Sequence, residues 1–587
     1  MVFVPAKLRA VLRRLARILA GRDDAALRFG TSEALLLDAL LEEADRSKDD
    51  AAFRNLRQRL STFSAPASLA APPSFVGTLR DYQHCGLGWF ESLRALNMGG
   101  CLADEMGLGK TVQVLAMLAS QHPAPLPPSA ATAAKRLAPT ATTATTAHGA
   151  SQQTSLLVVP RSIVQNWLDE AGRFVPHLRV LDLSRAECQL SDATFSSCDV
   201  AVITYGTLFR DIRELAQREF RYVILDEAQA IKSKSARTTK AAKCLRAQHR
   251  LVMTGTPIEN HLGELWSLME FLNPSLARHL ERLARSAEPD DLAIVRRAVR
   301  PFLLRRTKRE VAKELPERIE QTLHCDMTDA QRSHYEALRD RVRADLLGAV
   351  DGFDSGRSKL VILEGLLRLR QVACHPVLAD KKRRGAGSGK LEALLPMLEE
   401  SVHEGRKTLV FSQFTSFLAL VREELDRRGV LYEYLDGATR DRAERVSRFD
   451  SDPHGPIFLL SLKAGGVGLN LQCAERVILL DPWWNPAVEA QAIDRAHRIG
   501  QTRTVHAIRL VSAGTIEDRV IELQQQKRDL ADAIVSGDAG PLASLTREDL
   551  AFLLDSSGVH PIHAAATGTA LKSDRLRLRS SISSTTS

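Results

Sequence analysis

The sequence predicts an α/β fold with two lobes, each built on a parallel sheet, and with helical segments before, between and after them. Two series of short aliphatic runs, separated by helical stretches, lie in different parts of the chain. A glycine-rich loop that carries a lysine follows the first of these runs. With 587 residues and 44% hydrophobic residues, the chain is also long enough to bury several cores.

The first lobe is predicted over residues 76–274. Its candidate strands are the runs 101–103, 156–159, 200–203, 222–225 and 251–253. Unbroken runs of β-branched and aliphatic residues are typical of strands that a parallel sheet buries on both faces. Such sheets bind ligands beyond the carboxyl ends of their strands, so we expect functional residues directly after these runs.

The second lobe, predicted over residues 390–540, repeats the pattern. Its candidate strands are 408–411, 432–435, 457–460, 476–480 and 507–511. The other predicted segments are a helical N-terminal extension (1–75), a helical inter-lobe region (275–389), a C-terminal helix (541–563) and a disordered basic tail (564–587). Residues 122–154 are rich in Pro, Ala and Thr, so we expect a disordered insertion in the first lobe.

The segment after the first candidate strand has the chemistry of a loop that wraps nucleotide phosphates. It consists of Asp104, Glu105, Met106, Gly107, Leu108, Gly109, Lys110 and Thr111. Closely spaced glycines let backbone N–H groups turn toward an anion, Lys110 can reach the β- and γ-phosphates, and Thr111 is placed to ligate Mg²⁺. The strict motif has Gly where Asp104 stands, and an ordinary strand-to-helix turn is the alternative, so other residues must decide.

Two carboxylates at the end of a later candidate strand favour the nucleotide site. Residues 220–225 read as a buried strand and are followed by Asp226 and Glu227. In a P-loop ATPase this edge of the sheet faces the phosphates, so Asp226 can hold Mg²⁺ and Glu227 can orient and polarise the attacking water. A solvated acidic turn is the alternative, and the phosphate loop makes it less favoured.

Two arginines far downstream complete the predicted catalytic set. Arg495 and Arg498 are three residues apart, so on a helix they project from one face. Guanidinium groups placed against a transferring phosphoryl group act as arginine fingers, whereas a charged surface face is the alternative. Because both arginines belong to the second lobe, the two lobes must close on each other to form the site.

With these motifs in place, the chain resembles the Swi/Snf-type ATPases, the DNA-translocase branch of the superfamily-two helicases, over residues 76–535. The resemblance also rests on these runs: Leu79–Gln83, Leu157–Trp167, Ile203–Thr207, Leu303–Lys308, Leu409–Phe414, Asp436–Thr439, Ser461–Leu471, Asp481–Pro486 and Gln491–Gln501. The loop that begins with Asp104 is this family's own version of the phosphate loop. The resemblance implies two RecA-like lobes, ATP and Mg²⁺ as cofactors, and double-stranded DNA as a partner.

The resemblance also implies roles for individual residues. It places Gln83 at the adenine and Gly468 among the nucleotide-binding residues. The DNA contacts that it implies come from Pro160, Arg161, Thr204, Arg305, Arg306, Ser412, Ser461 and Trp483. Phosphate contacts carry no base information, so movement along DNA that is independent of sequence is expected.

The charge balance favours a polyanionic partner without proving one. Lys and Arg together number 80 against 71 for Asp and Glu, and the isoelectric point is about 9.2. Two basic clusters, Arg305–Arg309 and Lys381–Arg384, could neutralise phosphates and give salt-dependent binding. A solvated linker explains the second cluster equally well, because a glycine-rich stretch follows it.

Other features bound the class of protein. No run of 18 apolar residues occurs, so a membrane span is not expected. The eight cysteines include no CxxC pair, which argues against a zinc site and suits an intracellular protein. The Ala- and Arg-rich composition suggests a bacterial protein, expected to be cytoplasmic, nucleoid-associated and monomeric.

Three other functions stay open. A strand-separating DNA or RNA helicase shares these motifs, and an unwinding assay beside a triplex-displacement assay distinguishes it from a translocase. An RNA-polymerase-associated recycling ATPase would co-purify with polymerase, whereas a translocase could act on other DNA-bound proteins. A nucleic-acid-binding scaffold with an inactive ATPase belongs to a different class, which the presence of every catalytic residue type disfavours.

Overall fold

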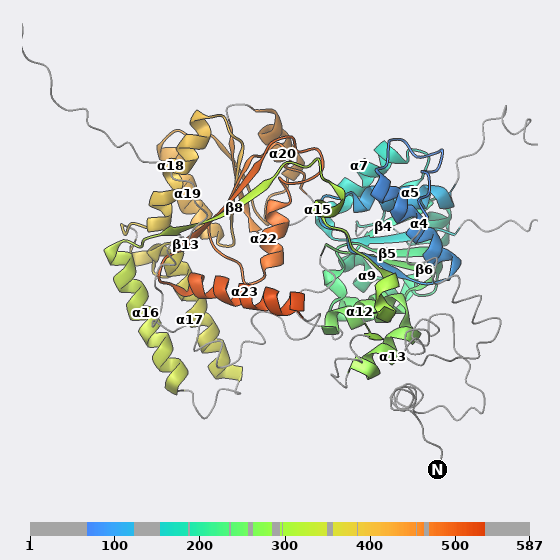
Figure 1. Ribbon diagram of the computed structural model, residues 1–587, viewed down its shortest axis with the longest axis horizontal. Helices are drawn as coiled ribbons and strands as arrows, with labels where there is room; N and C mark the ends of the chain where they lie inside the picture. The colour runs from blue at the N-terminus through green and yellow to red at the C-terminus, as the bar shows by residue number, and fades with distance from the viewer. Residues whose placement is uncertain are drawn as a thin grey trace, which may run out of the picture.

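Two lobes lie side by side in the computed structural model of the chain (Figure 1). The structure describes residues 67–122, 153–185, 188, 190–233, 236–255, 262–284, 294–295, 297–348, 356–383, 385–452, 455–462 and 469–533. Each lobe is a sheet of parallel strands with helices packed around it, which confirms the predicted α/β class with two RecA-like lobes.

The sheet of the first lobe has seven strands in the order β3-β4-β2-β5-β6-β1-β7, and every pair is parallel. The strands are β1 (Gly100–Leu102), β2 (Ser155–Val159), β3 (Val180–Asp182), β4 (Val200–Thr204), β5 (Glu219–Leu225), β6 (Arg246–Met253) and β7 (Leu303–Leu304). All five candidate strands of this lobe are confirmed. The edge strands β3 and β7 were not predicted, because they have only three and two residues and are half-buried.

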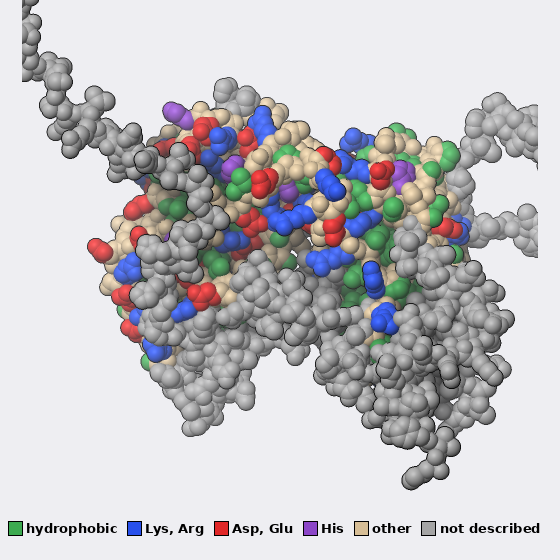
Figure 2. All heavy atoms as spheres, viewed as in Figure 1, with side chains coloured by type: hydrophobic (Ala, Val, Ile, Leu, Met, Phe, Trp, Pro, Cys, Tyr) green, Lys and Arg blue, Asp and Glu red, His purple; other side chains and the backbone are tan. Residues whose placement is uncertain are grey.

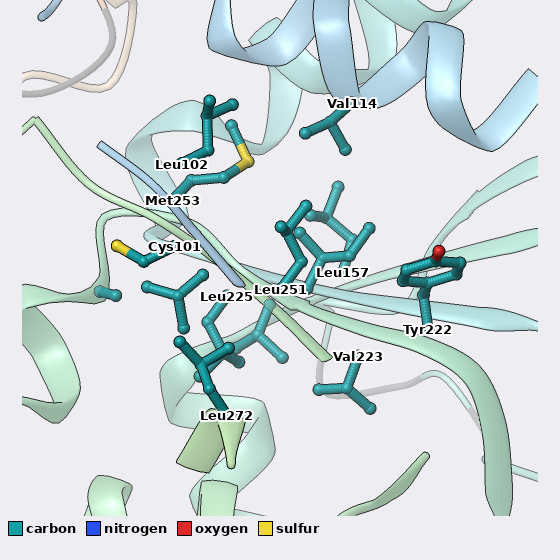
Figure 3. Packing of buried hydrophobic residues seen from close by; sticks show 14 of the residues in the cluster. Cys101, Leu102, Val114, Leu157, Tyr222, Val223, Leu225, Leu251, Met253 and Leu272 are labelled. Carbon is teal, nitrogen blue, oxygen red and sulfur yellow. The ribbon is translucent and has the colours of Figure 1, made fainter. Parts of the chain in front are cut away.

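Helices cover both faces of this sheet (Figure 1). They are α4 (Asp81–Ala95), α5 (Lys110–Gln121), α7 (Val164–Phe174), α8 (Asp192–Ser196), α9 (Tyr205–Arg210), α10 (Ile212–Leu215), α11 (Arg237–Cys244), α12 (Leu262–Leu272) and α13 (Pro274–Ala284). Figure 3 shows Val114 of α5 and Leu272 of α12 on opposite sides of the strands that carry Leu102, Val223 and Met253. Burial of each such side chain contributes about 1.5–3 kcal/mol, and this core fixes the strand ends that carry the site.

The sheet of the second lobe has six parallel strands in the order β10-β11-β9-β12-β13-β8. The strands are β8 (Arg318–Cys325), β9 (Thr408–Ser412), β10 (Tyr432–Leu435), β11 (Ile457–Ser461), β12 (Arg476–Leu479) and β13 (Val505–Ser512). The helices of this half are α18 (Gly389–His403), α19 (Thr415–Arg427), α20 (Arg442–Ser451), α22 (Pro486–Ile493) and α23 (Ile516–Ala533). All five candidate strands of this lobe are confirmed.

The segment between the lobes, which the sequence predicts to be helical, contributes a strand to each sheet. Strand β7 adds to the first sheet beside β1, and β8 adds to the second sheet beside β13, although both lie within the predicted helical region 275–389. Strand β8 escapes prediction because it is an edge strand whose side chains are mostly exposed, so it has no buried apolar run. The short helix α15 (Lys308–Val311) joins these strands, and α16 (Asp329–Gly348) and α17 (Gly356–Cys374) pack against each other below the second lobe (Figure 1).

Several predicted segments lie outside the described residues. They are the N-terminal extension up to residue 66, most of the insertion at 122–154, the C-terminal helix at 541–563 and the tail at 564–587. Among the helices that the structure describes, none is long and apolar enough to cross a membrane. All eight cysteines are free thiols.

Candidate active site

The phosphate loop connects the end of β1 to the start of α5. Gly107 and Gly109 have φ angles of 89° and 72°, a left-handed region that side chains other than glycine's rarely adopt. A Cβ atom at Gly109 would lie 2.6 Å from Nε2 of Gln83. The Nζ of Lys110 donates a hydrogen bond to the carbonyl oxygen of Asp104 at 2.7 Å, so the ammonium lies against the loop, and its predicted contact with the phosphates stays a prediction.

Asp104 supports the loop from inside the lobe. Its side chain is fully buried, and its carboxylate accepts hydrogen bonds from Arg306 Nε at 2.9 Å and from Gln113 Nε2 at 3.1 Å. Arg306 also donates to Gln113 Oε1 at 2.7 Å and to the carbonyl oxygen of Tyr82. The guanidinium of Arg306 is therefore hydrogen-bonded to residues inside lobe 1, and its position does not support the predicted contact with DNA.

Gln83 of α4 lies directly beside the phosphate loop. Its Nε2 donates to the carbonyl oxygen of Leu108 at 3.2 Å, and its Oε1 accepts from the backbone N–H of Arg80 at 2.9 Å. Tyr82 donates to the same Leu108 carbonyl at 2.8 Å. The predicted contact of Gln83 with adenine stays a prediction, and its amide already helps to fix the loop.

The two predicted carboxylates follow β5. Asp226 accepts hydrogen bonds from Trp167 Nε1 and from the backbone N–H of Glu227, each at 2.8 Å. Burial, followed by the charge of Glu227, raises the pKa of Asp226 to about 7. Glu227 itself has a φ angle of 47°, which is uncommon for a residue other than glycine.

The residues of this edge fit a magnesium ion. Asp226 is 6% exposed, and a buried carboxylate with a raised pKa beside a second carboxylate favours a nearby cation. Oε2 of Glu227 is buried without a hydrogen-bond partner. Thr111 is the second residue of α5, directly after Lys110, and its hydroxyl is the other candidate ligand. Phosphate oxygens and waters usually complete such a site, so few protein ligands suffice.

The two arginines follow α22 and meet lobe 1 across the junction. The α-helix ends at Ile493, so Arg495 and Arg498 lie in the tight turns after it rather than on the helix that the sequence predicts. They still point the same way, because Nη1 of each lies within 3.5 Å of the Leu469 carbonyl oxygen. A Cβ atom at Gly107 would lie 2.7 Å from Cβ of Arg498, so this segment rests on the phosphate loop.

The charges of these arginines are placed against lobe 1 carboxylates. Arg495 is 2% exposed, and burial lowers its pKa to about 10, while the negative charge of Glu227 opposes that shift. Burial also lowers the pKa of Arg498, and Glu170 of α7 opposes it. Lys110, Asp226, Glu227 and the two arginines are therefore brought together at one junction. Gly468, the other predicted nucleotide-binding residue, lies outside the described residues.

The residues predicted to contact DNA have diverse environments. Arg161 and Arg305 are exposed and Pro160 is half-buried, and Figure 2 shows Lys and Arg side chains on both lobes near their junction. Thr204 is a helix cap, since its hydroxyl accepts from the N–H of Thr207 at 3.1 Å. Ser412 is fully buried and donates to Asp481 Oδ1 at 2.5 Å.

Two further predicted DNA contacts lie in lobe 2. Ser461 is 4% exposed at the end of β11, and Trp483 packs against the lobe 2 core. Ser412 and Ser461 therefore expose little surface to a DNA strand in this arrangement of the lobes.

Two functional side chains were not assigned from the sequence. Trp167 donates a hydrogen bond to the Asp226 carboxylate. In the sequence, only its position at the end of the run Leu157–Trp167 indicated a function. Lys308, which the sequence shows as part of a basic cluster and as the end of the run Leu303–Lys308, is buried at the junction and bonded to Asp494 Oδ1 at 2.7 Å. Sequence alone carries no sign of that pairing, because its partner belongs to the other lobe.

Comparisons with known proteins agree with this architecture. Residues 82–378 match the SNF2-related domain, and residues 389–500 match the helicase conserved C-terminal domain. An uncharacterized ATP-dependent helicase of Mycoplasma pneumoniae is 34% identical over 491 residues, which cover 82% of this chain and 44% of the relative. The putative ATP-dependent helicase/translocase YwqA of Bacillus subtilis is 33% identical over 506 residues, which cover 83% and 52%.

This chain therefore spans about half the length of these curated relatives. A solved structure of the Sulfolobus solfataricus SWI2/SNF2 ATPase core in complex with dsDNA is 31% identical and covers 83% of this chain and 99% of its own, with a TM-score of 0.38. At that TM-score nothing about the arrangement of the lobes follows from it. The family matches, in contrast, cover both lobes, and they confirm the resemblance: the chain belongs to the SNF2-related family.

Proposed function

We propose that this chain is an ATP-driven translocase that moves along double-stranded DNA and displaces or remodels proteins bound to it. One observation carries the proposal: two arginines of lobe 2 lie against the phosphate loop and the carboxylates of lobe 1. Cβ of Arg498 approaches Gly107, and Arg495 is close enough to Glu227 for their charges to interact. A site divided between two lobes links each ATP cycle to their relative movement.

Each side chain has a distinct part in ATP hydrolysis. The phosphate loop binds the phosphates through backbone N–H groups, and Lys110 neutralises part of their charge. Thr111 and Asp226 would hold Mg²⁺, which neutralises charge on the β- and γ-phosphate oxygens. Glu227 orients the attacking water, and its buried Oε2 is available to accept a hydrogen bond. Arg495 and Arg498 stabilise the charge that spreads over the γ-phosphoryl oxygens.

The movement follows from where these groups are attached. ATP on lobe 1 attracts the two arginines of lobe 2, so binding favours closure and loss of the γ-phosphate weakens it. If each lobe grips the duplex through phosphate contacts, alternate closing and opening advances the protein along the DNA.

The choice of duplex DNA rests on charge and on the family. The chain has a net charge of +9, and Arg161 and Arg305 are exposed. YwqA is named a putative helicase/translocase, and a mouse relative, a SWI/SNF-related regulator of chromatin, is 34% identical over 493 residues. Arg306 and Ser412 are bonded internally, so the proposal does not rest on them.

The test is the steady-state ATPase rate of the purified chain alone and with duplex DNA, single-stranded DNA or duplex RNA, with Lys110→Ala as the blank. We expect duplex DNA to give the largest stimulation. A Lys110-dependent rate that no nucleic acid changes would contradict the proposal.

Translocation and strand separation need separate assays. A translocase displaces the third strand of a DNA triplex while leaving a plain duplex intact, whereas a strand-separating helicase unwinds the duplex. Unwinding that keeps pace with triplex displacement would favour the helicase instead.

A further inference from the structure

A buried lysine between the lobes joins the two halves of the site. Lys308 begins α15, in the segment that leaves lobe 1 for lobe 2, and its side chain is 5% exposed. Its Nζ bonds Asp494 Oδ1 at 2.7 Å and the carbonyl oxygen of His497 at 2.5 Å. Asp494 directly precedes Arg495, and His497 directly precedes Arg498. The Lys308 ammonium therefore bonds the residue before Arg495 and the residue before Arg498.

The same residue is bound to the phosphate loop. The backbone N–H of Lys308 donates to Glu105 Oε2 at 2.7 Å, and its Nζ lies 3.8 Å from Glu105 Oε1. The backbone N–H of Glu105 donates to the carbonyl oxygen of Arg306 at 2.9 Å, which fixes this linker to the loop. The bridge therefore runs from Glu105 in lobe 1 through Lys308 to Asp494 in lobe 2.

Neighbouring groups close the junction around this bridge. Arg318 Nη1 lies 3.3 Å from Asp494 Oδ1, and His497 Nε2 lies 2.8 Å from the carbonyl oxygen of Pro316. A small apolar cluster excludes water beside it. Its members are Tyr82, Leu108, Val311, Ala312, Leu315 and Ile499. These residues come from lobe 1, the linker and lobe 2, so the ion bridge and the cluster form a single contact between the lobes.

We propose that Lys308 is a positioning residue that couples the phosphate loop to the two arginines through the Glu105–Lys308–Asp494 bridge. Lys308 acts by holding the segment Asp494–Arg498 at the distance from Gly107 that catalysis needs. Because Glu105 belongs to the phosphate loop, the lobe 1 end of the bridge lies in the segment proposed to bind the nucleotide. This role rests on the proposed function and identifies the contact through which the lobes communicate.

Chemistry explains why a lysine suits this position. A carboxylate from each lobe would repel the other across the junction, where Asp494 is buried and Glu105 is 32% exposed, and the ammonium between them converts that repulsion into attraction. Methionine has nearly the same length as lysine without the charge. Lys308→Met therefore keeps the packing and removes the bridge.

The test compares Lys308→Met with Lys313→Met, an exposed lysine in the same linker. We expect kcat at saturating DNA to fall about tenfold or more in Lys308→Met, while the Kd for ATP stays within about threefold, because the phosphate loop is intact. Lys313→Met should match the wild type. A combined Lys308→Met and Asp494→Asn variant should be no slower than the slower single variant, since both break one bridge.

A second measurement does not depend on ATPase activity. Small-angle X-ray scattering without nucleotide or DNA should give a larger radius of gyration for Lys308→Met than for the wild type and Lys313→Met. If the wild type lacks nucleic-acid-stimulated turnover, the proposed function fails while the scattering still decides on the bridge. Wild-type kcat and dimensions in Lys308→Met, or a loss of ATP affinity that equals the loss of kcat, would overturn the positioning role.

Discussion

Two buried lysines, one inside lobe 2 and one between the lobes, have similar partners and different consequences. Lys390 of α18 is fully buried, and its Nζ lies 2.6 Å from Glu517 Oε2 and 2.6 Å from the carbonyl oxygen of Leu480. Lys308 is 5% exposed and makes a 2.7 Å ion pair with Asp494. In both cases a buried ammonium is paired with a carboxylate. The hydrogen-bond partners of Lys390 all belong to lobe 2, whereas those of Lys308 belong to both lobes.

The two ammonium groups also differ in how well their charge is compensated. Burial lowers the pKa of Lys390, but the charge and hydrogen bond of Glu517, together with Cys374 and Asp481, outweigh burial and leave that pKa above its usual value. Burial lowers the pKa of Lys308, and Asp494 only partly restores it. Water can reach the Lys308 bridge when the lobes separate, whereas it can reach Lys390 only if lobe 2 unfolds. The pair Lys390–Glu517 stabilises a lobe, and the pair Lys308–Asp494 regulates a contact between the lobes.

Removing the charge of Lys390 should have the largest effect on stability. Lys390→Met leaves Glu517 buried without its partner, so we expect the free energy of unfolding of lobe 2 to fall by about 3–5 kcal/mol. Chemical denaturation followed by circular dichroism measures this change. A double variant with Glu517→Leu should recover most of the loss, and an unchanged midpoint in Lys390→Met would mean that the pair contributes nothing.

A methyl group at Gly107 should disturb the junction more than the fold. Gly107→Ala places Cβ 2.7 Å from Cβ of Arg498 at a φ of 89°, so the arginine segment must move away. We expect ATP turnover to fall about tenfold or more, with a loss of stability of about 1–3 kcal/mol from backbone strain.

The matched control is Gly429→Ala, which has a φ of 67° and nothing within 4 Å of the added Cβ atom. It should lose some stability from strain and keep full turnover. If Gly429→Ala slowed ATP turnover as much as Gly107→Ala, strain rather than the contact with Arg498 would explain both.

The Asp226 carboxylate should make Mg²⁺ binding depend on pH. Its pKa rises from 3.8 to about 7 on folding, so the folded state binds the proton more tightly and this group's contribution to stability falls as the pH rises through that window. Mg²⁺ needs the ionised form, so millimolar Mg²⁺ should raise the Tm more at about pH 8 than at about pH 5, by roughly 2 °C. Asp226→Ala should abolish the difference, and an equal Mg²⁺ effect in that variant would place the ion elsewhere.

The smallest stability effect should come from the bridge between the lobes. Lys308→Met should lower the unfolding free energy by less than about 1 kcal/mol, because lobe separation returns Asp494 and Glu105 to water. Denaturation under the conditions used for Lys390→Met gives the comparison. A loss as large as that of Lys390→Met would show that the lobes do not separate before they unfold.

The sequence predicts the buried parts of the fold well. All ten candidate strands are found, nine inside a sheet and one, β10, at an edge. The strands that escape prediction, β3, β7 and β8, lie at sheet edges, where one side faces solvent or a short connection and the apolar signal is weak. The predicted boundary at residue 390 fails to include β8 for the same reason.

The residues proposed as catalytic could also be chosen from the sequence, because each follows a strand or lies in a short motif. Lys110, Asp226 and Glu227 gather at one sheet edge as expected for parallel strands. The pairs Asp104 with Arg306 and Lys308 with Asp494 were not predictable, because each joins residues that are far apart in the chain. Such pairs depend on how the linker and the lobes pack, which periodicity does not encode.

In the proposed mechanism, ATP held by lobe 1 is hydrolysed with the help of arginines from lobe 2. The most direct measurement is the duplex-DNA-stimulated ATPase rate of Arg498→Ala, together with its Kd for ATP. We predict that turnover falls by about 10³-fold while the affinity for ATP stays within about threefold, as for the loss of an arginine finger. Near-wild-type turnover in Arg498→Ala would contradict the claim.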